Sequence, residues 1–223
     1  MERGKDMNKD IRKEGIIAIM RGIPYDKLIS VAQALYDGGI RIIECTFEQE
    51  KEEAEEIFKQ KIQLLKNYFG DKMMIGAGTV LTESQVQVAY EVGCELIITP
   101  NTNRNIIAKI KENNMIAIIG ALTPSEIVEA KEAGADFVKV FPAGNLGVKY
   151  FSSIKAPLSH IPMLAVGSIG LEEVREFTKA GVLGFGIGSP LVPPKAVEEE
   201  DYVRIQRLAE EYVRCFSKSI VMC

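Results

Sequence analysis

The sequence contains a single histidine, His160, among its 223 residues. That residue lies between an expected helix end and Pro162, a context typical of a loop. Histidine is the side chain used most often as a general base near neutral pH. The sequence therefore gives little support to an enzyme mechanism that depends on a histidine base.

The sequence also lacks paired cysteines, long apolar runs and clusters of basic residues. Its four cysteines, Cys45, Cys94, Cys215 and Cys223, form no CxxC pair. Because no signal peptide and no run of 18 apolar residues is visible, we expect a soluble protein of the reducing cytoplasm, without a membrane partner. The 27 basic and 31 acidic residues give a net charge of -4. Without a basic stripe, we expect no nucleic-acid partner.

Short apolar segments alternate with segments of helical periodicity along the whole chain, which predicts alternating strands and helices. The expected strands cover residues 15–20, 40–45, 73–77, 95–98, 115–119, 136–141, 163–166 and 182–187. The expected helices cover residues 25–37, 49–67, 83–92, 104–113, 125–133, 172–180 and 198–216. Residues 144–154 are expected to form a loop and a short helix.

Strands that are apolar throughout are typical of a parallel sheet covered on both faces. Eight such βα units close naturally as a (β/α)8 TIM barrel, and 47% hydrophobic residues suffice for one core. We therefore predict one barrel domain over residues 1–223, with a polar lead-in at 1–10 and a C-terminal helix. A doubly wound sheet is the alternative, but Met20-Arg21-Gly22-Ile23 is not the Gly-rich turn that it requires.

Lys139 interrupts an apolar strand segment that runs from Asp136 to Pro142. Lysine is almost never fully buried unless it is paired. In one interpretation the side chain points to solvent from a half-buried strand. In the other it is held inside the protein, where desolvation lowers its pKa and the neutral amine can attack a carbonyl group.

The active site of a (β/α)8 barrel forms at the C-terminal ends of its strands. Polar residues expected at those ends are candidate site residues. Any one of them taken alone is better explained by a structural role, and their shared position on one rim is the evidence. The candidates are Arg21, Glu44, Thr46, Thr79, Thr99, Asn101, Lys139, Gly167, Ser168, Gly188 and Ser189.

Glu44 lies near the end of the second expected strand. If it points inward, it lies near Lys139 in a small cavity. Its carboxylate can then shuttle protons, directly or through a water molecule. It can equally form a salt bridge that only neutralises the lysine.

Two Gly-Ser pairs, Gly167-Ser168 and Gly188-Ser189, follow the last two expected strands. Small residues expose backbone N–H groups, and the amino end of a helix favours an anion. Phosphate binding at the seventh and eighth loops recurs in these barrels. The two pairs together therefore predict a phosphate site.

Three stretches carry a family resemblance: Gly39 to Thr46 (GIRIIECT), Gly76 to Leu81 (GAGTVL) and Phe137 to Ala143 (FVKVFPA). In this order, ahead of two Gly-rich loops, they resemble the bacterial 2-keto-3-deoxy-6-phosphogluconate (KDPG) and 4-hydroxy-2-oxoglutarate (KHG) aldolases, which are class I, Schiff-base enzymes. The resemblance covers about residues 15–193. It implies a cytoplasmic homotrimeric barrel that needs no metal and no organic cofactor.

The resemblance also implies roles for particular residues. Lys139 corresponds to the Schiff-base lysine and Glu44 to the general acid/base. Thr79 corresponds to a contact near the pyruvyl carboxylate, and Arg21 to an arginine that many members carry after the first strand. Gly167, Ser168, Gly188 and Ser189 correspond to the phosphate-binding loops.

The sequence departs from the family pattern at Glu48, where many members carry an arginine that holds the substrate carboxylate. A carboxylate cannot replace a guanidinium as an anion clamp. Arg21, Thr79 or Asn101 must then hold the substrate carboxylate, or the substrate differs. Ser168 stands where the family often has a second glycine, and the acidic helix after Glu48 is longer than usual.

The resemblance implies reversible aldol cleavage of a 2-keto-3-deoxy sugar acid. KDPG would yield pyruvate and glyceraldehyde 3-phosphate, and KHG would yield pyruvate and glyoxylate. One alternative is a phosphosugar isomerase or epimerase on the same barrel, which needs no lysine in the sixth strand. Another is a non-catalytic sugar-phosphate-binding barrel, which the departure at Glu48 motivates.

Overall fold

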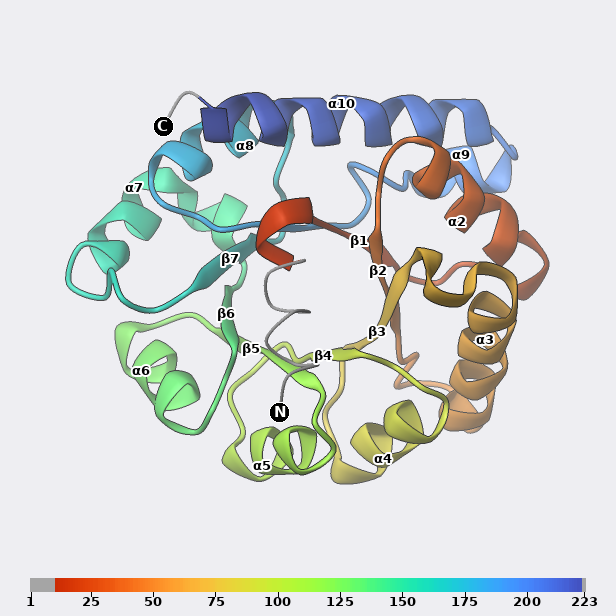
Figure 1. Ribbon diagram of the computed structural model, residues 1–223, viewed down its shortest axis with the longest axis horizontal. Helices are drawn as coiled ribbons and strands as arrows, with labels where there is room; N and C mark the ends of the chain where they lie inside the picture. Colours follow the sequence, from red (N-terminus) through yellow and green to blue (C-terminus); the bar gives the residue numbers. More distant parts are fainter. Residues whose placement is uncertain (1–10, 222–223) are drawn as a thin grey trace.

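A computed structural model of the protein, which describes residues 11–221, shows a closed barrel of eight parallel strands (Figure 1). This confirms the predicted (β/α)8 fold. The strands are β1 (Ile16–Met20), β2 (Ile42–Thr46), β3 (Met74–Gly78), β4 (Leu96–Ile98), β5 (Ile116–Ala121), β6 (Phe137–Val140), β7 (Met163–Val166) and β8 (Phe185–Ile187). Neighbouring strands pair in sequence order, and β8 pairs with β1 to close the ring.

Helices surround the ring of strands on its outer side (Figure 1). The α-helices are α2 (Leu28–Asp37), α3 (Ala54–Phe69), α4 (Glu83–Glu91), α5 (Arg104–Glu112), α6 (Pro124–Glu132), α7 (Ala143–Lys155), α8 (Leu171–Lys179), α9 (Pro194–Glu198) and α10 (Tyr202–Val221). Two 3-10 helices, η1 (Tyr25–Lys27) and η2 (Gly70–Lys72), complete the connections. The predicted lead-in at 1–10 and Cys223 lie outside the described residues. Within residues 11–221, every helix is too short or too polar to cross a bilayer.

Side-chain alternation along each strand builds two separate cores. In β6, Phe137 packs inside the barrel, whereas Val138 and Val140 pack between the barrel and its helices. The interior core contains Ile17, Ile42, Leu96, Ile98, Ile116, Ile118, Phe137 and Leu164. These side chains fill the barrel interior toward the amino-terminal ends of the strands. The space for a site therefore lies at the C-terminal ends.

The short helical segment at residues 11–14 covers the amino-terminal end of the barrel (Figure 1). Ile11 is buried and belongs to the interior core. The Arg12 guanidinium carbon lies 5.5 Å from the centre of the Phe137 ring. This end of the barrel is therefore capped by side chains of the chain itself.

Several predicted boundaries differ from the structure. Helix α3 begins at Ala54 instead of residue 49, because residues 48–53 form turns in which Lys51 N donates to Glu48 O at 3.0 Å. Strand β8 begins at Phe185 instead of residue 182.

The last predicted helix, residues 198–216, corresponds to α10, which begins at Tyr202 and follows a separate short helix, α9 (Pro194–Glu198). The chain turns at Glu200, whose φ is 58°, and the Asp201 carboxylate then accepts from Arg204 N at 3.0 Å. The second helix, α10, extends to Val221 and lies against α2 and α8 (Figure 1). The predicted short helix at 144–154 is α7, which is interrupted at Gly147.

Candidate active site

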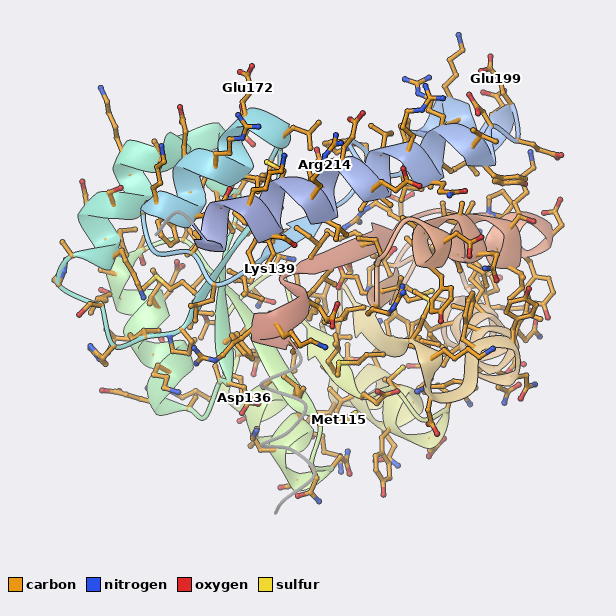
Figure 2. The ribbon with its side chains drawn as sticks, turned by 45° about the horizontal axis from the view of Figure 1, so that its top comes forward. Met115, Asp136, Lys139, Glu172, Glu199 and Arg214 are labelled. Carbon is orange, nitrogen blue, oxygen red and sulfur yellow. The ribbon has the colours of Figure 1, made fainter. Side chains whose placement is uncertain are left out.

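Lys139 lies in β6 with its side chain buried, at 5% exposure, so the solvent-facing interpretation is wrong. It alternates with Val138 and Val140, which pack outside the barrel. Figure 2 places it in the middle of the molecule, away from the surface positions of Glu172 and Glu199. Its Nζ lies 4.9 Å from the centre of the Phe141 ring, so an aromatic face covers part of the amine.

Glu44 lies in β2, four places from β6 in the closed ring and therefore on the opposite wall. It is 2% exposed, and its Oε2 has no hydrogen-bond partner within the described residues. Space for this carboxylate comes from Gly78, where an added Cβ would collide with Oε2. Among the ion pairs of residues 11–221, none joins Glu44 to Lys139, so the interpretation as a direct salt bridge is not supported.

Burial shifts the pKa values of both groups toward their neutral forms. Desolvation raises the pKa of Glu44 above its ordinary value, although the nearby Lys139 and Arg21 charges oppose the shift. Desolvation lowers the pKa of Lys139, the Glu44 charge opposes this, and the Arg21 charge adds to it. The lowered pKa of Lys139 favours the neutral amine, which is its nucleophilic form.

Arg21 and Thr79 meet at the rim above this pair. Arg21 Nη2 donates to Thr79 Oγ1 at 3.4 Å, across 58 residues of sequence. Thr79 has a φ of 57°, which is rare for a β-branched residue. Arg21 is exposed and influences the pKa values of both Glu44 and Lys139, so its charge lies near the interior. A guanidinium beside a hydroxyl is suited to hold a carboxylate.

Asn101 lies on the same rim but is exposed. Its backbone carbonyl accepts from Thr99 Oγ1 at 2.7 Å, and Thr99 Oγ1 accepts from Gly120 N at 3.1 Å. Gly120 pairs with Lys139 in the sheet, and a Cβ there would collide with the Pro100 backbone. The buried Thr99 therefore fixes the Asn101 backbone next to the lysine strand, while a substrate role for the Asn101 side chain stays a prediction.

The geometry is that of a buried amine facing a carboxylate across a barrel, and the comparisons with known proteins agree with it. The profile of the family described as "KDPG and KHG aldolase" matches residues 7–208. The chain belongs to the KDPG and KHG aldolase family. It is therefore an aldolase, an enzyme that cleaves a carbon–carbon bond.

Individual relatives of this aldolase cover most of its length. The 2-dehydro-3-deoxy-6-phosphogalactonate aldolase of Escherichia coli strain K12 is 36% identical over 177 residues, which are 79% of this chain and 83% of the relative. The KDPG aldolase of Legionella pneumophila, solved with pyruvate captured at low pH as a covalent carbinolamine intermediate, is 25% identical with a TM-score of 0.81. That alignment covers 91% of this chain and 96% of the solved chain.

A third similar structure is a cube-shaped protein cage designed by fusing symmetric oligomeric domains. It is 32% identical with a TM-score of 0.83, and the alignment covers 94% of this chain and 74% of the cage chain. A part of that cage chain therefore shares the barrel described here.

The two predicted phosphate loops of the aldolase lie side by side on the rim. Val166 in β7 pairs with Gly186 in β8, so the loops that follow these strands are neighbours. Gly167 and Ser168 both have positive φ values, 94° and 54°, and Gly144 N donates to Gly167 O at 2.9 Å. The loop conformation is thus held by the start of α7, and Ser168 is left exposed.

One backbone donor near these loops is already occupied. Gly170 N, at the amino end of α8, donates to the carboxylate of Glu173 at 3.1 Å. Ser168 and Ser189, in contrast, are exposed on this rim.

Glu48 forms ion pairs with two lysines, Lys51 and Lys61. Its two carboxylate oxygens accept from Lys61 at 2.7 Å and from Lys51 at 2.6 Å. Lys61 is itself buried in α3, at 8% exposure. Desolvation raises the pKa of Glu48, but the hydrogen bonds from Lys51 and Lys61 outweigh it and hold the pKa below its ordinary value. Where the family often has an arginine, this aldolase has a carboxylate that neutralises its own lysines.

This pairing predicts a stability role for Glu48. Glu48→Gln should lower the free energy of unfolding by about 1–3 kcal/mol, because it leaves the Lys61 ammonium buried without a counter-charge. Urea unfolding measures the change. In a Lys61→Met background, adding Glu48→Gln should cause a much smaller loss of stability. Equal losses in the two backgrounds would contradict the pairing.

The same pair predicts a pH dependence. A carboxylate whose pKa is lowered in the folded state stabilises the protein fully above its ordinary pKa of 4.5. That contribution disappears as the pH falls through the lowered value. The stability difference between the wild-type protein and Glu48→Gln should therefore be present at neutral pH and shrink in acid.

The sequence-based selection included Thr46 but missed Phe141. Thr46 follows Glu44 on the interior side of β2, and its buried Oγ1 has no hydrogen-bond partner within the described residues. Its position at a strand end was the available signal. Phe141, whose ring lies beside Lys139, gave no signal beyond its place in the FVKVFPA motif.

Proposed function

We propose that Lys139 is the Schiff-base lysine of this aldolase and that Glu44 is its general acid/base. The observation that carries the proposal is the buried pair itself, in which the Lys139 amine and the Glu44 carboxyl face one barrel interior without forming an ion pair. A structural salt bridge would satisfy the carboxylate, whereas Glu44 Oε2 is left unpartnered within the described residues. Unpaired buried polar atoms are costly and are typical of catalytic groups.

The first half of the reaction forms the covalent intermediate. The neutral amine of Lys139 adds to the C2 carbonyl of the substrate and gives a carbinolamine. Loss of water from the carbinolamine gives a protonated imine, whose positive charge withdraws electrons from C3. The trapped carbinolamine of the Legionella pneumophila relative, a protein of the same fold and family, supports this order of events.

The second half breaks the carbon–carbon bond. Glu44, directly or through a water molecule, removes the proton from the C4 hydroxyl. The C3–C4 bonding electrons then move into the imine and form an enamine, and the aldehyde leaves. The enamine is protonated at C3, and water hydrolyses the resulting imine to release pyruvate and free Lys139. Each proton that Glu44 accepts is thus available for the enamine.

The rim of the barrel holds the two ends of the substrate. We assign the keto-acid carboxylate to Arg21 and Thr79, whose side chains already contact one another. We assign a terminal phosphate to the neighbouring loops Gly167-Ser168 and Gly188-Ser189. With Glu48 neutralised by its lysines, its charge does not oppose a carboxylate at the rim.

The substrate proposed is a phosphorylated 2-keto-3-deoxy sugar acid. Two open loops on one rim favour a phosphate over the short KHG molecule. The Escherichia coli relative is named for the phosphogalactonate compound, which differs from KDPG in configuration at C4. Both C4 epimers and KHG should therefore be compared by following pyruvate release with a coupled dehydrogenase, and a marked preference for KHG would contradict the phosphate assignment.

The phosphate assignment predicts the effect of a charge at Ser168. Ser168→Asp should lower kcat/KM for the phosphorylated acid by about tenfold relative to the same acid without phosphate, because like charges repel. Ser168→Asn is the matched control, since both residues tolerate the left-handed conformation that Ser168 adopts. An equal loss for both substrates, or an equal loss in both variants, would contradict phosphate binding here.

The proposal extends to assembly and location. The family resemblance implies a homotrimer, and a similar barrel forms part of a cage built from symmetric oligomeric domains. Light scattering should therefore give a mass of three chains.

Three buried free cysteines, Cys45, Cys94 and Cys215, favour the reducing cytoplasm.

A further inference from the structure

Two glutamine side chains connect the loop after β2 to the loop after β3. Gln49 follows β2, and Gln85 lies in the first turn of α4. Gln85 Nε2 donates to Gln49 Oε1 at 2.8 Å, and Gln49 Nε2 donates to the backbone carbonyl of Thr79 at 2.6 Å. At the other end, Gln85 Oε1 accepts from Leu81 N at 2.8 Å. We call this pair the amide bridge.

The backbone fixes the orientation of both amides in the bridge. Leu81 N can only donate, so Gln85 must present its oxygen to it. The Thr79 carbonyl can only accept, so Gln49 must present its nitrogen there. The remaining nitrogen of Gln85 then meets the remaining oxygen of Gln49, which is the contact observed. The four groups therefore form one consistent chain of donors and acceptors.

The bridge holds the residue whose backbone is strained. Thr79 has a φ of 57°, a left-handed conformation that is strained for a β-branched residue. The bridge forms hydrogen bonds to the backbone on both sides of Val80, at the Thr79 carbonyl and at the Leu81 amide. Gln85 is only 6% exposed, so water does not readily replace its contact with Leu81 N, whereas Gln49 is exposed. Such strain persists only where the surroundings determine the conformation.

We propose that Gln49 and Gln85 are positioning residues for the substrate carboxylate, acting through Thr79. By holding Thr79 in its left-handed conformation, the amide bridge directs Thr79 Oγ1 to Arg21. In the loop after β2, Glu48 stands where many family members carry an arginine. The loop thus contributes to carboxylate binding through Gln49, the residue that follows Glu48. This inference rests on the proposed function, in which Arg21 and Thr79 bind the carboxylate.

The test uses pyruvate as the probe, because it carries the carboxylate and lacks the phosphate. The readout is the pyruvate concentration that gives half-maximal reductive trapping of the imine, together with the maximal trapping rate. Gln49→Met and Gln85→Met should each raise the half-saturating concentration about tenfold, the worth of one or two hydrogen bonds, with the maximal rate within about threefold of wild type. Their combination should add little, because each breaks the same bridge.

Gln87→Met is the matched control. Gln87 lies in the same helix and donates to Glu91 at 3.1 Å, outside the bridge. Its replacement by the same residue should leave the half-saturating concentration unchanged. An equal effect of Gln87→Met would mean that α4 is simply loosened, and this result would overturn the proposal.

A double-mutant cycle with Thr79→Gly separates positioning from general stability. Glycine adopts a positive φ without strain, so the bridge has nothing left to hold in that background. Thr79→Gly alone should weaken pyruvate binding, and adding Gln49→Met should change it little further. Additive effects would show that Gln49 acts independently of Thr79 and would overturn the proposal.

Arg21→Met distinguishes failure of this inference from failure of the function on which it rests. If Arg21→Met weakens pyruvate binding and the glutamine variants do not, the amide bridge has no positioning role. If Arg21→Met has no effect on pyruvate binding, the carboxylate lies elsewhere and both assignments are wrong. If the wild-type protein traps no pyruvate, the Schiff-base proposal itself fails.

Discussion

We expect Lys139→Met to abolish aldol cleavage, with kcat reduced by at least about 1,000-fold, because the variant has no amine to form the imine. Methionine fills nearly the same volume without a nitrogen, so the contact with the Phe141 ring is retained. Pyruvate release from the preferred sugar acid measures the effect. The loss should appear in kcat, since Arg21 and Thr79, the residues proposed to bind the carboxylate, remain in place.

Folding of the variant provides the control for this result. Removing a buried amine that makes no ion pair within the described residues should leave the midpoint of thermal unfolding unchanged or raise it. A folded Lys139→Met protein that turns over at the wild-type rate would refute the covalent route. A protein that unfolds would be replaced by Lys139→Gln, which also lacks the amine.

Glu44→Gln separates the two halves of the reaction. We expect kcat for cleavage to fall about 100- to 10,000-fold, the usual contribution of a general acid/base, because glutamine cannot accept the C4 hydroxyl proton. Imine formation with pyruvate should continue more slowly, since the Lys139 amine is intact. Pyruvate release and reductive trapping, measured on the same preparation, report the two halves.

The direction of the pKa shift at Lys139 sharpens this expectation. The Glu44 charge raises the lysine pKa, so its removal should lower that pKa further and leave the amine neutral. Loss of trapping in Glu44→Gln would therefore show that Glu44 also acts in imine formation, as the acid that assists loss of water. Unchanged cleavage would show that it is not the acid/base.

Much of the fold follows from the sequence because parallel strands buried on both faces leave a clear pattern of apolar segments and turns. The boundaries that were predicted wrongly depend on contacts between distant segments. Residues 49–53 have helical composition, but Gln49 bonds the Thr79 carbonyl and Glu48 bonds Lys61, so the helix begins only at Ala54. No local rule contains that information.

The orientation of Lys139 shows the same limit. Its strand is apolar on both faces, so alternation along the sequence does not say which side is inside. The closed ring decides it, because Phe137 and Lys139 share the face that packs in the interior, opposite Glu44. The family motif indicated Lys139 from the sequence, and its position inside the barrel explains why its amine is desolvated.

The Glu48 departure needed the structure to be understood. From the sequence, a carboxylate in place of an arginine suggested that another residue holds the substrate carboxylate, that the substrate differs, or that activity is lost. The structure shows that Lys61, 13 residues further along the chain, donates a hydrogen bond to the Glu48 carboxylate. The amide bridge between Gln49 and Gln85 had no sequence signal, because amide side chains are common on loops and helix ends.

Borohydride trapping with pyruvate, followed by peptide mass mapping, tests the central claim most directly. The account predicts a reduced adduct on Lys139, seen as a tryptic peptide covering residues 132–149 in which cleavage after Lys139 is blocked. Lys155 is an internal comparison, since its pKa is also lowered by burial but its Nζ donates to the Ser159 and Ile161 carbonyls. No adduct in folded protein, or an adduct on Lys155 instead of Lys139, would contradict the account.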